Sequence, residues 1–223
     1  MKRLLCIGCS NGSHFESVFT ELMPQWQIHP LSSPAAGNRF ITNRLIEWIA
    51  VNGKPDRVYL QFSGVWRRDI CYDPTWSLSG YEYQTHTQWF TWIHSGGFYG
   101  NWLLNKSALK LFEHQHAVIE SDRSQVAQQN LAEIATAVAV CNNLNLPMQW
   151  STYYNYLRPH SDLIKNNDGF INKWPQWLSL DQHIKWTPIE HAHKLQKIPQ
   201  DEIHFSREVF RDWLLSYGSW LIS

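Results

Sequence analysis

The sequence predicts an α/β fold with a parallel sheet, because short apolar strands alternate with amphipathic helices along its first third. The segments 4–7 and 57–62 are apolar runs of strand length, and apolar residues repeat at helical spacing between 38 and 52. Such alternation is typical of βαβ units, in which neighbouring strands run parallel. At 223 residues, without an internal repeat or a linker, the chain is expected to form a single domain over 1–223.

The individual elements follow from apolar spacing and from the residues that start and end them. Ser13-His14-Phe15-Glu16 has the form of a capping box, and Asn38 is placed as the N-cap of the next helix, which Asn52-Gly53 ends. The expected strands are 4–7, 26–31, 57–62 and 147–152, and the expected helices are 13–22, 38–52, 107–143 and 206–215.

Between about 67 and 105 the alternation gives way to a stretch rich in tryptophan, tyrosine and glycine. The whole chain has 13 tryptophans, and four of them, Trp76, Trp89, Trp92 and Trp102, lie in this stretch. Its length predicts an insertion over one end of the sheet. The aromatic rings of such an insertion can stack on sugar rings, cover an acyl chain, or pack the insertion onto the sheet.

Composition excludes several classes of function. Lys plus Arg equals Asp plus Glu at 19 each, and no basic run occurs, so a nucleic-acid partner is not expected. The apolar start ends at Gly8, too early for a signal peptide, and no run has membrane-spanning length. A cytoplasmic protein is therefore expected, and nothing in the sequence indicates an oligomeric state.

Neither the cysteines nor the histidine pairs indicate a cofactor. Cys6 and Cys9 have redox-motif spacing, but Cys6 lies inside the first expected strand and not at a helix start. Cys71 and Cys141 are likewise expected to be reduced thiols. His114 and His116 are two residues apart on an expected helix and point to different faces, and His191-x-His193 lacks an obvious third ligand, so we expect no metal and no cofactor.

Two distant segments carry the residue types of a hydrolytic triad. Ser10 follows the first strand within Gly8-Cys9-Ser10-Asn11-Gly12, a turn before a helix. His204 precedes the last helix, and Asp201 lies three positions before it. A serine hydroxyl needs an adjacent base, and the base needs a group that fixes its tautomer, so these residues form a nucleophile, a base and an orienting acid if the fold joins the chain ends.

A Gly-x-Ser turn after strand one, Gly37-Asn38 after strand two and a terminal Asp-x-x-His together resemble the SGNH/GDSL hydrolase family. The resemblance covers the chain from its first strand to its last helix, and Gly-Cys-Ser is similar to a divergent set of that family. It implies a flavodoxin-like three-layer α/β/α fold and ester hydrolysis, including that of acetylated sugars and lipids. It also implies an oxyanion hole built from the amides of Ser10 and Gly37.

The chain departs from this family at two places. Cys9 stands where the family has an aspartate, and the Gly-x-Asn-Asp expected after strand three is replaced by Gln61-Phe62-Ser63-Gly64. Asn38, Ser63 or Gln61 is then the candidate for the missing oxyanion donor. Ser63 and Arg67 lie where ligands bind in open α/β sheets, so both are candidate substrate-binding residues.

We therefore expect a serine esterase that cleaves a small-molecule or carbohydrate ester, with an O-acetyl group as one candidate, through an acyl-enzyme on Ser10. Two alternatives remain open at this stage. One is an acyltransferase that moves the acyl group to a sugar hydroxyl. The other is a carbohydrate-binding protein on the same fold whose oxyanion hole has decayed.

Overall fold

A parallel sheet of four strands forms the centre of the computed structural model, which describes residues 1–64, 67, 69–72, 84–94, 123–153, 182–184, 186–196 and 204–223. All neighbouring strands of this sheet pair in parallel, in the order β2-β1-β3-β7. The strands are β1 (Lys2–Ile7), β2 (Trp26–Pro30), β3 (Arg57–Phe62) and β7 (Met148–Thr152). The predicted α/β class with a parallel sheet is confirmed.

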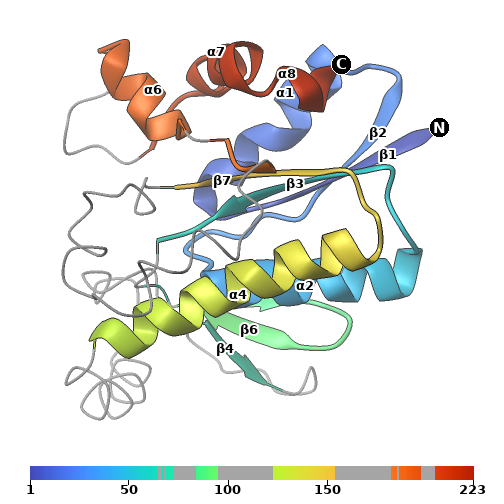
Figure 1. Ribbon diagram of the computed structural model, residues 1–223, viewed down its shortest axis with the longest axis vertical. Helices are drawn as coiled ribbons and strands as arrows, with labels where there is room; N and C mark the ends of the chain where they lie inside the picture. The colour runs from blue at the N-terminus through green and yellow to red at the C-terminus, as the bar shows by residue number, and fades with distance from the viewer. Residues whose placement is uncertain are drawn as a thin grey trace.

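Helices cover both faces of the sheet and complete three layers (Figure 1). On one face lie α2 (Asn38–Asn52) and α4 (Arg123–Asn143). On the other face lie α1 (Phe15–Leu22), α6 (Pro188–Lys194), α7 (Arg207–Tyr217) and α8 (Ser219–Ile222). The last helices of the chain therefore lie beside its first one.

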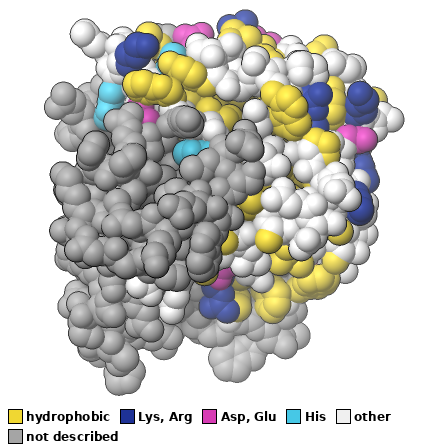
Figure 2. Space-filling view, in the orientation of Figure 1, with side chains coloured by type: hydrophobic (Ala, Val, Ile, Leu, Met, Phe, Trp, Pro, Cys, Tyr) yellow, Lys and Arg dark blue, Asp and Glu magenta, His cyan; other side chains and the backbone are white. Residues whose placement is uncertain are grey.

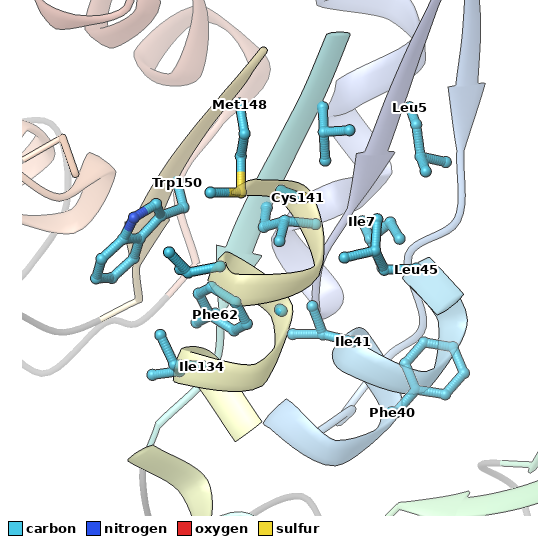
Figure 3. Packing of buried hydrophobic residues seen from close by; sticks show 14 of the residues in the cluster. Leu5, Ile7, Phe40, Ile41, Leu45, Phe62, Ile134, Cys141, Met148 and Trp150 are labelled. Carbon is cyan, nitrogen blue, oxygen red and sulfur yellow. The ribbon is translucent and has the colours of Figure 1, made fainter. Parts of the chain in front are cut away.

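Alternating side chains along the strands divide the apolar interior into two cores, one on each face of the sheet. Leu5 and Ile7 of β1 belong to the cluster under α2 and α4, whereas Leu4 and Cys6 belong to the cluster under α1 and α7. Successive strand residues point to opposite faces, so a strand covered on both sides must be apolar throughout. Figure 3 shows part of the first cluster, in which Met148 and Trp150 of β7 lie near Cys141 and Phe62.

The insertion contains a second, antiparallel sheet that the sequence analysis did not predict. Its strands are β4 (Asp69–Tyr72), β5 (Gln84–His86) and β6 (Thr91–His94), in the order β4-β6-β5. Trp92 is buried and its ring meets Phe40 of α2 at 5.7 Å between centroids, so this tryptophan packs the insertion onto the helix. Trp89 is 40% exposed. The other aromatic residues of this stretch that the sequence analysis singled out, Trp76, Tyr81, Tyr83, Phe98, Tyr99 and Trp102, lie outside the described residues.

Two helix starts differ from the expectation. The Ser13–Glu16 capping box is not formed, because the chain enters α1 through the 3-10 helix η1 (Ser10–His14) and His14 is the N-cap, with no side-chain cap bond. Asn38 is the first residue of α2, and its N-cap is Gly37. Of the expected helix 107–143, the structure describes α4.

Acidic and basic side chains are interspersed on the described part of the face seen in Figure 2. Within the described ranges, no helix combines the length and the apolar character needed to cross a membrane.

Candidate active site

Ser10 lies at the carboxyl end of β1, as the first residue of η1. The turn is closed by a hydrogen bond from the Gly12 N–H to the Cys9 carbonyl, 2.9 Å long. A side chain at Gly12 would collide with Ser32, so only glycine allows the turn and the loop after β2 to approach this closely. Ser10 is partly exposed, and its hydroxyl is available at the edge of the sheet where the strands end.

His204 reaches the same edge from the other end of the chain. Its Nε2 lies 3.2 Å from the Oγ of Ser10, a hydrogen-bond distance between residues 194 positions apart. The neighbouring Phe205 is 3% exposed and stacks on Phe210 of α7, which anchors the segment in the core. Ser206 caps α7 by accepting from the Val209 N–H.

A second histidine holds the segment that carries His204. The Nε2 of His14 lies 3.0 Å from the carbonyl oxygen of Phe205, and a carbonyl can only accept, so His14 donates this hydrogen bond. His14 ends η1, the helix that begins with Ser10. The short helix η1 therefore provides the Ser10 hydroxyl and, through His14, also holds Phe205, the neighbour of His204.

Ion pairs fasten α1 to α7 on the outer surface. Arg207 and Arg211 of α7 both contact Glu21 of α1, with 2.6 Å between the Arg211 Nε and the Glu21 Oε1. The hydrogen bonds from Arg211 and Arg207 lower the pKa of the Glu21 carboxyl. These contacts are exposed and individually weak, but they join the two helices that follow Ser10 and His204 in the chain.

A pocket of about 230 Å³ opens beside Ser10. The loop after β2 forms its far wall, held along the end of β1 by hydrogen bonds from Leu31 N–H to Cys6 O and from Ser33 N–H to Gly8 O. Hydroxyls, two prolines and one carboxylate face this space. The lining residues are Cys9, Ser10, Gly12, Ser13, Glu16, Pro30, Ser32, Ser33 and Pro34.

Asn38 is fully buried, with one half of its amide engaged. Its Oδ1 accepts from the Ser63 N–H at 2.7 Å, at the end of β3. Its Nδ2 is buried and has no hydrogen-bond partner within the part of the chain that the structure describes. A buried donor without a partner costs about 1–3 kcal/mol, and natural proteins keep few of them. Asn38 thus places a donor at the carboxyl edge of the sheet whose N–H groups have no partner among the described residues.

Of the other expected oxyanion and substrate residues, Gly37, Ser63 and Arg67 are engaged within the protein. Gln61 is fully buried, and neither atom of its side-chain amide has a hydrogen-bond partner among the described residues. The Gly37 N–H donates to Oδ1 of Asp69 at 2.8 Å, so this amide is directed at a carboxylate. Ser63 is buried and its N–H orients Asn38. Arg67 donates to the Ala36 carbonyl at 3.2 Å, and its guanidinium lies 5.6 Å from the ring centroid of Tyr153, between the loops that follow β2 and β7.

Asp201, His114 and His116 lie outside the described residues. All four cysteines are unpaired, and burial raises the pKa of the Cys6 thiol well above its usual value, which disfavours the thiolate that redox chemistry needs. Among the described side chains, no group of three or more His, Cys, Asp or Glu is placed to hold a metal ion.

Three residues around the site, His14, Asp69 and His94, were not predicted from the sequence to belong to it. His14 could have been noticed because it lies on the same short turn as Ser10. Asp69 and His94 carry no local signal, because their contacts join positions 25 residues apart in strands that were not predicted.

No family model matches the chain, and no curated protein matches it. Among solved structures, the chain is similar to AlinE4, an SGNH-hydrolase family esterase, with 9% identity and a TM-score of 0.45, over 99% of this chain and 94% of that chain. It is also similar to LAE5, an alpha/beta hydrolase enzyme from the metagenome of Lake Arreo, Spain, with 10% identity and a TM-score of 0.45, over 97% and 95%.

Proposed function

We propose that this protein is a serine hydrolase that cleaves small esters through a covalent acyl-enzyme on Ser10. The observation that carries the proposal is the 3.2 Å distance between Ser10 Oγ and His204 Nε2. An imidazole within hydrogen-bond reach is what a serine hydroxyl needs to act as a nucleophile near neutral pH. The pocket beside the hydroxyl gives an ester a place to bind.

In the proposed reaction the Ser10 hydroxyl gives its proton to His204 Nε2 as its oxygen bonds to the ester carbonyl carbon. The tetrahedral intermediate collapses, the C–O bond to the alcohol breaks, and the imidazolium returns the proton to the departing alcohol. Water then repeats these steps on the acyl-enzyme and releases the acid. Asp201 is assigned to accept the Nδ1–H of His204 and so to fix the tautomer with Nε2 unprotonated.

The negative charge on the carbonyl oxygen needs donors at the same edge of the sheet. We assign this role to the backbone N–H of Ser10 and to the side-chain amide of Asn38, whose Nδ2 is buried without a partner in the described structure. The engaged Gly37 N–H is assigned to placing the start of α2, since it already donates to Asp69. A donor aimed at a developing charge typically contributes about a hundredfold or more to the rate.

The proposed substrate is an ester with a short acyl group. A pocket of about 230 Å³, lined by several hydroxyl groups and a carboxylate, suits an acetyl group better than a long acyl chain. A carbohydrate is the favoured alcohol, because the tryptophan-rich stretch between 67 and 105 offers flat rings that stack on sugars.

Hydrolysis of p-nitrophenyl acetate, compared with p-nitrophenyl decanoate and with an O-acetylated sugar, tests this proposal. Ser10→Ala and His204→Ala are each expected to lower kcat by about a thousandfold or more while the protein stays folded. Asp201→Ala is expected to cost less, because orienting groups leave residual activity. Ser216→Ala, on the exposed side of α7, is the matched control and keeps full activity.

Undiminished turnover in Ser10→Ala would overturn the proposal. Adding free sugar to the same assay measures the share of acyl groups that water receives. If most of them pass to the sugar, the protein is an acyltransferase with the same nucleophile.

A further inference from the structure

A carboxylate and an imidazole are buried together under the insertion, away from the proposed triad. The side chains of Asp69 in β4 and His94 in β6 are both 0% exposed, and His94 Nδ1 lies 2.8 Å from Asp69 Oδ1. Burying charged groups is costly unless they are paired and hydrogen-bonded. Because burying this pair is costly, we look for a function of the pair beyond packing the small sheet.

The Asp69 carboxylate is satisfied by donors from three directions. Oδ1 accepts from the Gly37 N–H at 2.8 Å as well as from His94, and Oδ2 accepts from the Phe40 N–H at 2.8 Å. A side chain at Gly37 would come within 2.7 Å of Asp69 Oδ2, so glycine is needed for this approach. Charge-assisted bonds to backbone amides are about twice as strong as neutral ones.

Through these contacts Asp69, a residue of β4, caps the first turn of α2. Gly37 is the N-cap of α2 and has no side chain to accept from its first turn, where Phe40 is the third helical residue. A helix start leaves its first N–H groups without partners, and an acidic group there satisfies them and interacts favourably with the helix dipole. Asn38 lies between the two amides that Asp69 holds.

His94 holds Asp69 and extends the network to the pocket wall. A neutral His94 ring that donates from Nδ1 to Asp69 accepts at Nε2 from Thr85 Oγ1, which is 3.2 Å away. Thr85 in turn contacts the Oγ of Ser33, which lines the pocket beside Ser10. The network thus joins the second sheet, the start of α2 and the loop after β2.

We propose that Asp69, oriented by His94, is a positioning residue that fixes Asn38 as an oxyanion donor. By holding the amides on both sides of Asn38, it sets the backbone from which the Nδ2 group projects, while Ser63 holds the Oδ1. The antiparallel sheet of the insertion is then the support of the oxyanion hole. This inference rests on the proposed function, because Asn38 has this task only in a hydrolase.

A double-mutant cycle on the whole chain tests the inference, with kcat and KM for p-nitrophenyl acetate as readout. Asn38→Ala is expected to lower kcat about a hundredfold. Asp69→Asn is expected to lower kcat by at least about tenfold with KM changed by less than about threefold, since a misplaced donor weakens transition-state binding. In the double variant, Asp69→Asn should cost nothing further, because its effect acts through Asn38.

Two further variants separate positioning from general loosening. His94→Gln keeps a side-chain donor and should retain more activity than Asp69→Asn. Glu47→Gln is the matched control: Glu47 is buried in α2 and accepts from the Trp89 N–H of the insertion at 3.0 Å, but lies away from the helix start. Its kcat should match that of the unmodified protein.

Nuclear magnetic resonance spectroscopy tests the same inference without measuring enzymatic activity. In the folded Asp69→Asn and His94→Gln proteins, the Gly37 and Phe40 amide signals and the Asn38 side-chain amide signals should all move, and in Glu47→Gln they should not. Unmoved Asn38 signals, or equal costs of Asp69→Asn with and without Asn38, would overturn the inference while leaving the proposed function intact. Activity that survives Ser10→Ala would overturn the proposed function instead.

Discussion

At the scale of single residues, the site depends on how accurately one imidazole is held. His204 is exposed and precedes its helix, so its own secondary structure gives it little support. The support comes from the neighbouring residue: Phe205 is buried by its ring and held at its carbonyl by His14. A base displaced by a fraction of a hydrogen-bond length loses much of its advantage.

His14→Ala is expected to lower kcat by about tenfold or more with little change in KM, because the base moves while the pocket remains. His14→Gln, which can still donate to the Phe205 carbonyl, should recover part of this loss. Steady-state kinetics with p-nitrophenyl acetate measures both. If His14→Ala matched the unmodified protein, the contact would have no role in placing His204.

At the scale of elements, α1 and α7 form a unit across the ends of the chain. Their inner faces meet in the aromatic cluster of Phe15, Phe19 and Phe210, and their outer faces meet through Glu21. Because Ser10 lies shortly before α1 and His204 shortly before α7, contacts that stabilise this pair of helices also hold the two halves of the proposed site together.

Glu21→Gln is expected to lower the thermal unfolding midpoint near neutral pH and to have no effect at low pH. The arginines lower the pKa of Glu21 in the folded state, so its stabilising contribution is present above the pKa of the unfolded chain and is lost as pH falls through the folded-state pKa. Calorimetry at both pH values and at two salt concentrations measures it. A difference that persists at low pH, or that ignores salt, would show that the ion pairs are not its cause.

The elements also show what the sequence could predict. The strands of the parallel sheet were predicted within a residue or two. β1 is apolar from Leu4 to Ile7, as expected of a strand covered on both faces. The strands of the insertion have three or four residues each, and Gln84-Thr85-His86 is wholly polar. They are held by contacts such as Asp69 with His94 that leave no local pattern. The capping box at Ser13 was wrong because a 3-10 helix occupies those residues.

Some features of the candidate site could likewise be predicted from the sequence, and others could not. Ser10 and His204 were expected to meet only if the fold joins the chain ends, and the structure places Ser10 Oγ 3.2 Å from His204 Nε2. Asn38 was correctly predicted at the start of α2, but it was predicted to cap that helix. The Asp69 carboxylate of β4 caps the first turn instead. That Asp69, and not Asn38, caps α2 depends on tertiary contacts that no local sequence pattern shows.

At the scale of the whole molecule, the sheet separates two apolar cores, and only one of them joins the chain ends. The cluster under α1 and α7 includes residues from β1 and from the last helix. Phe210 lies at its centre, fully buried and in ring contact with Phe15, Phe205 and Trp213. Loss of this ring removes packing from both halves of the site at once.

Phe210→Ala is expected to lower the free energy of unfolding by about 3–5 kcal/mol, the usual cost of an aromatic ring removed from a core. Urea denaturation measures it, and kcat of the folded fraction should fall as well because the anchor of Phe205 is lost. Phe40→Ala, in the other core, is a comparison of equal size. A cost below about 1 kcal/mol would mean that the core can close over the lost ring.

The reaction of the folded protein with a fluorophosphonate, mapped by mass spectrometry, tests most directly whether His204 activates Ser10. We predict a single adduct on Ser10 that forms at least about a hundredfold more slowly in His204→Ala and at the normal rate in His193→Ala. An unlabelled Ser10 in the folded protein, or labelling that is as fast without His204, would contradict the account.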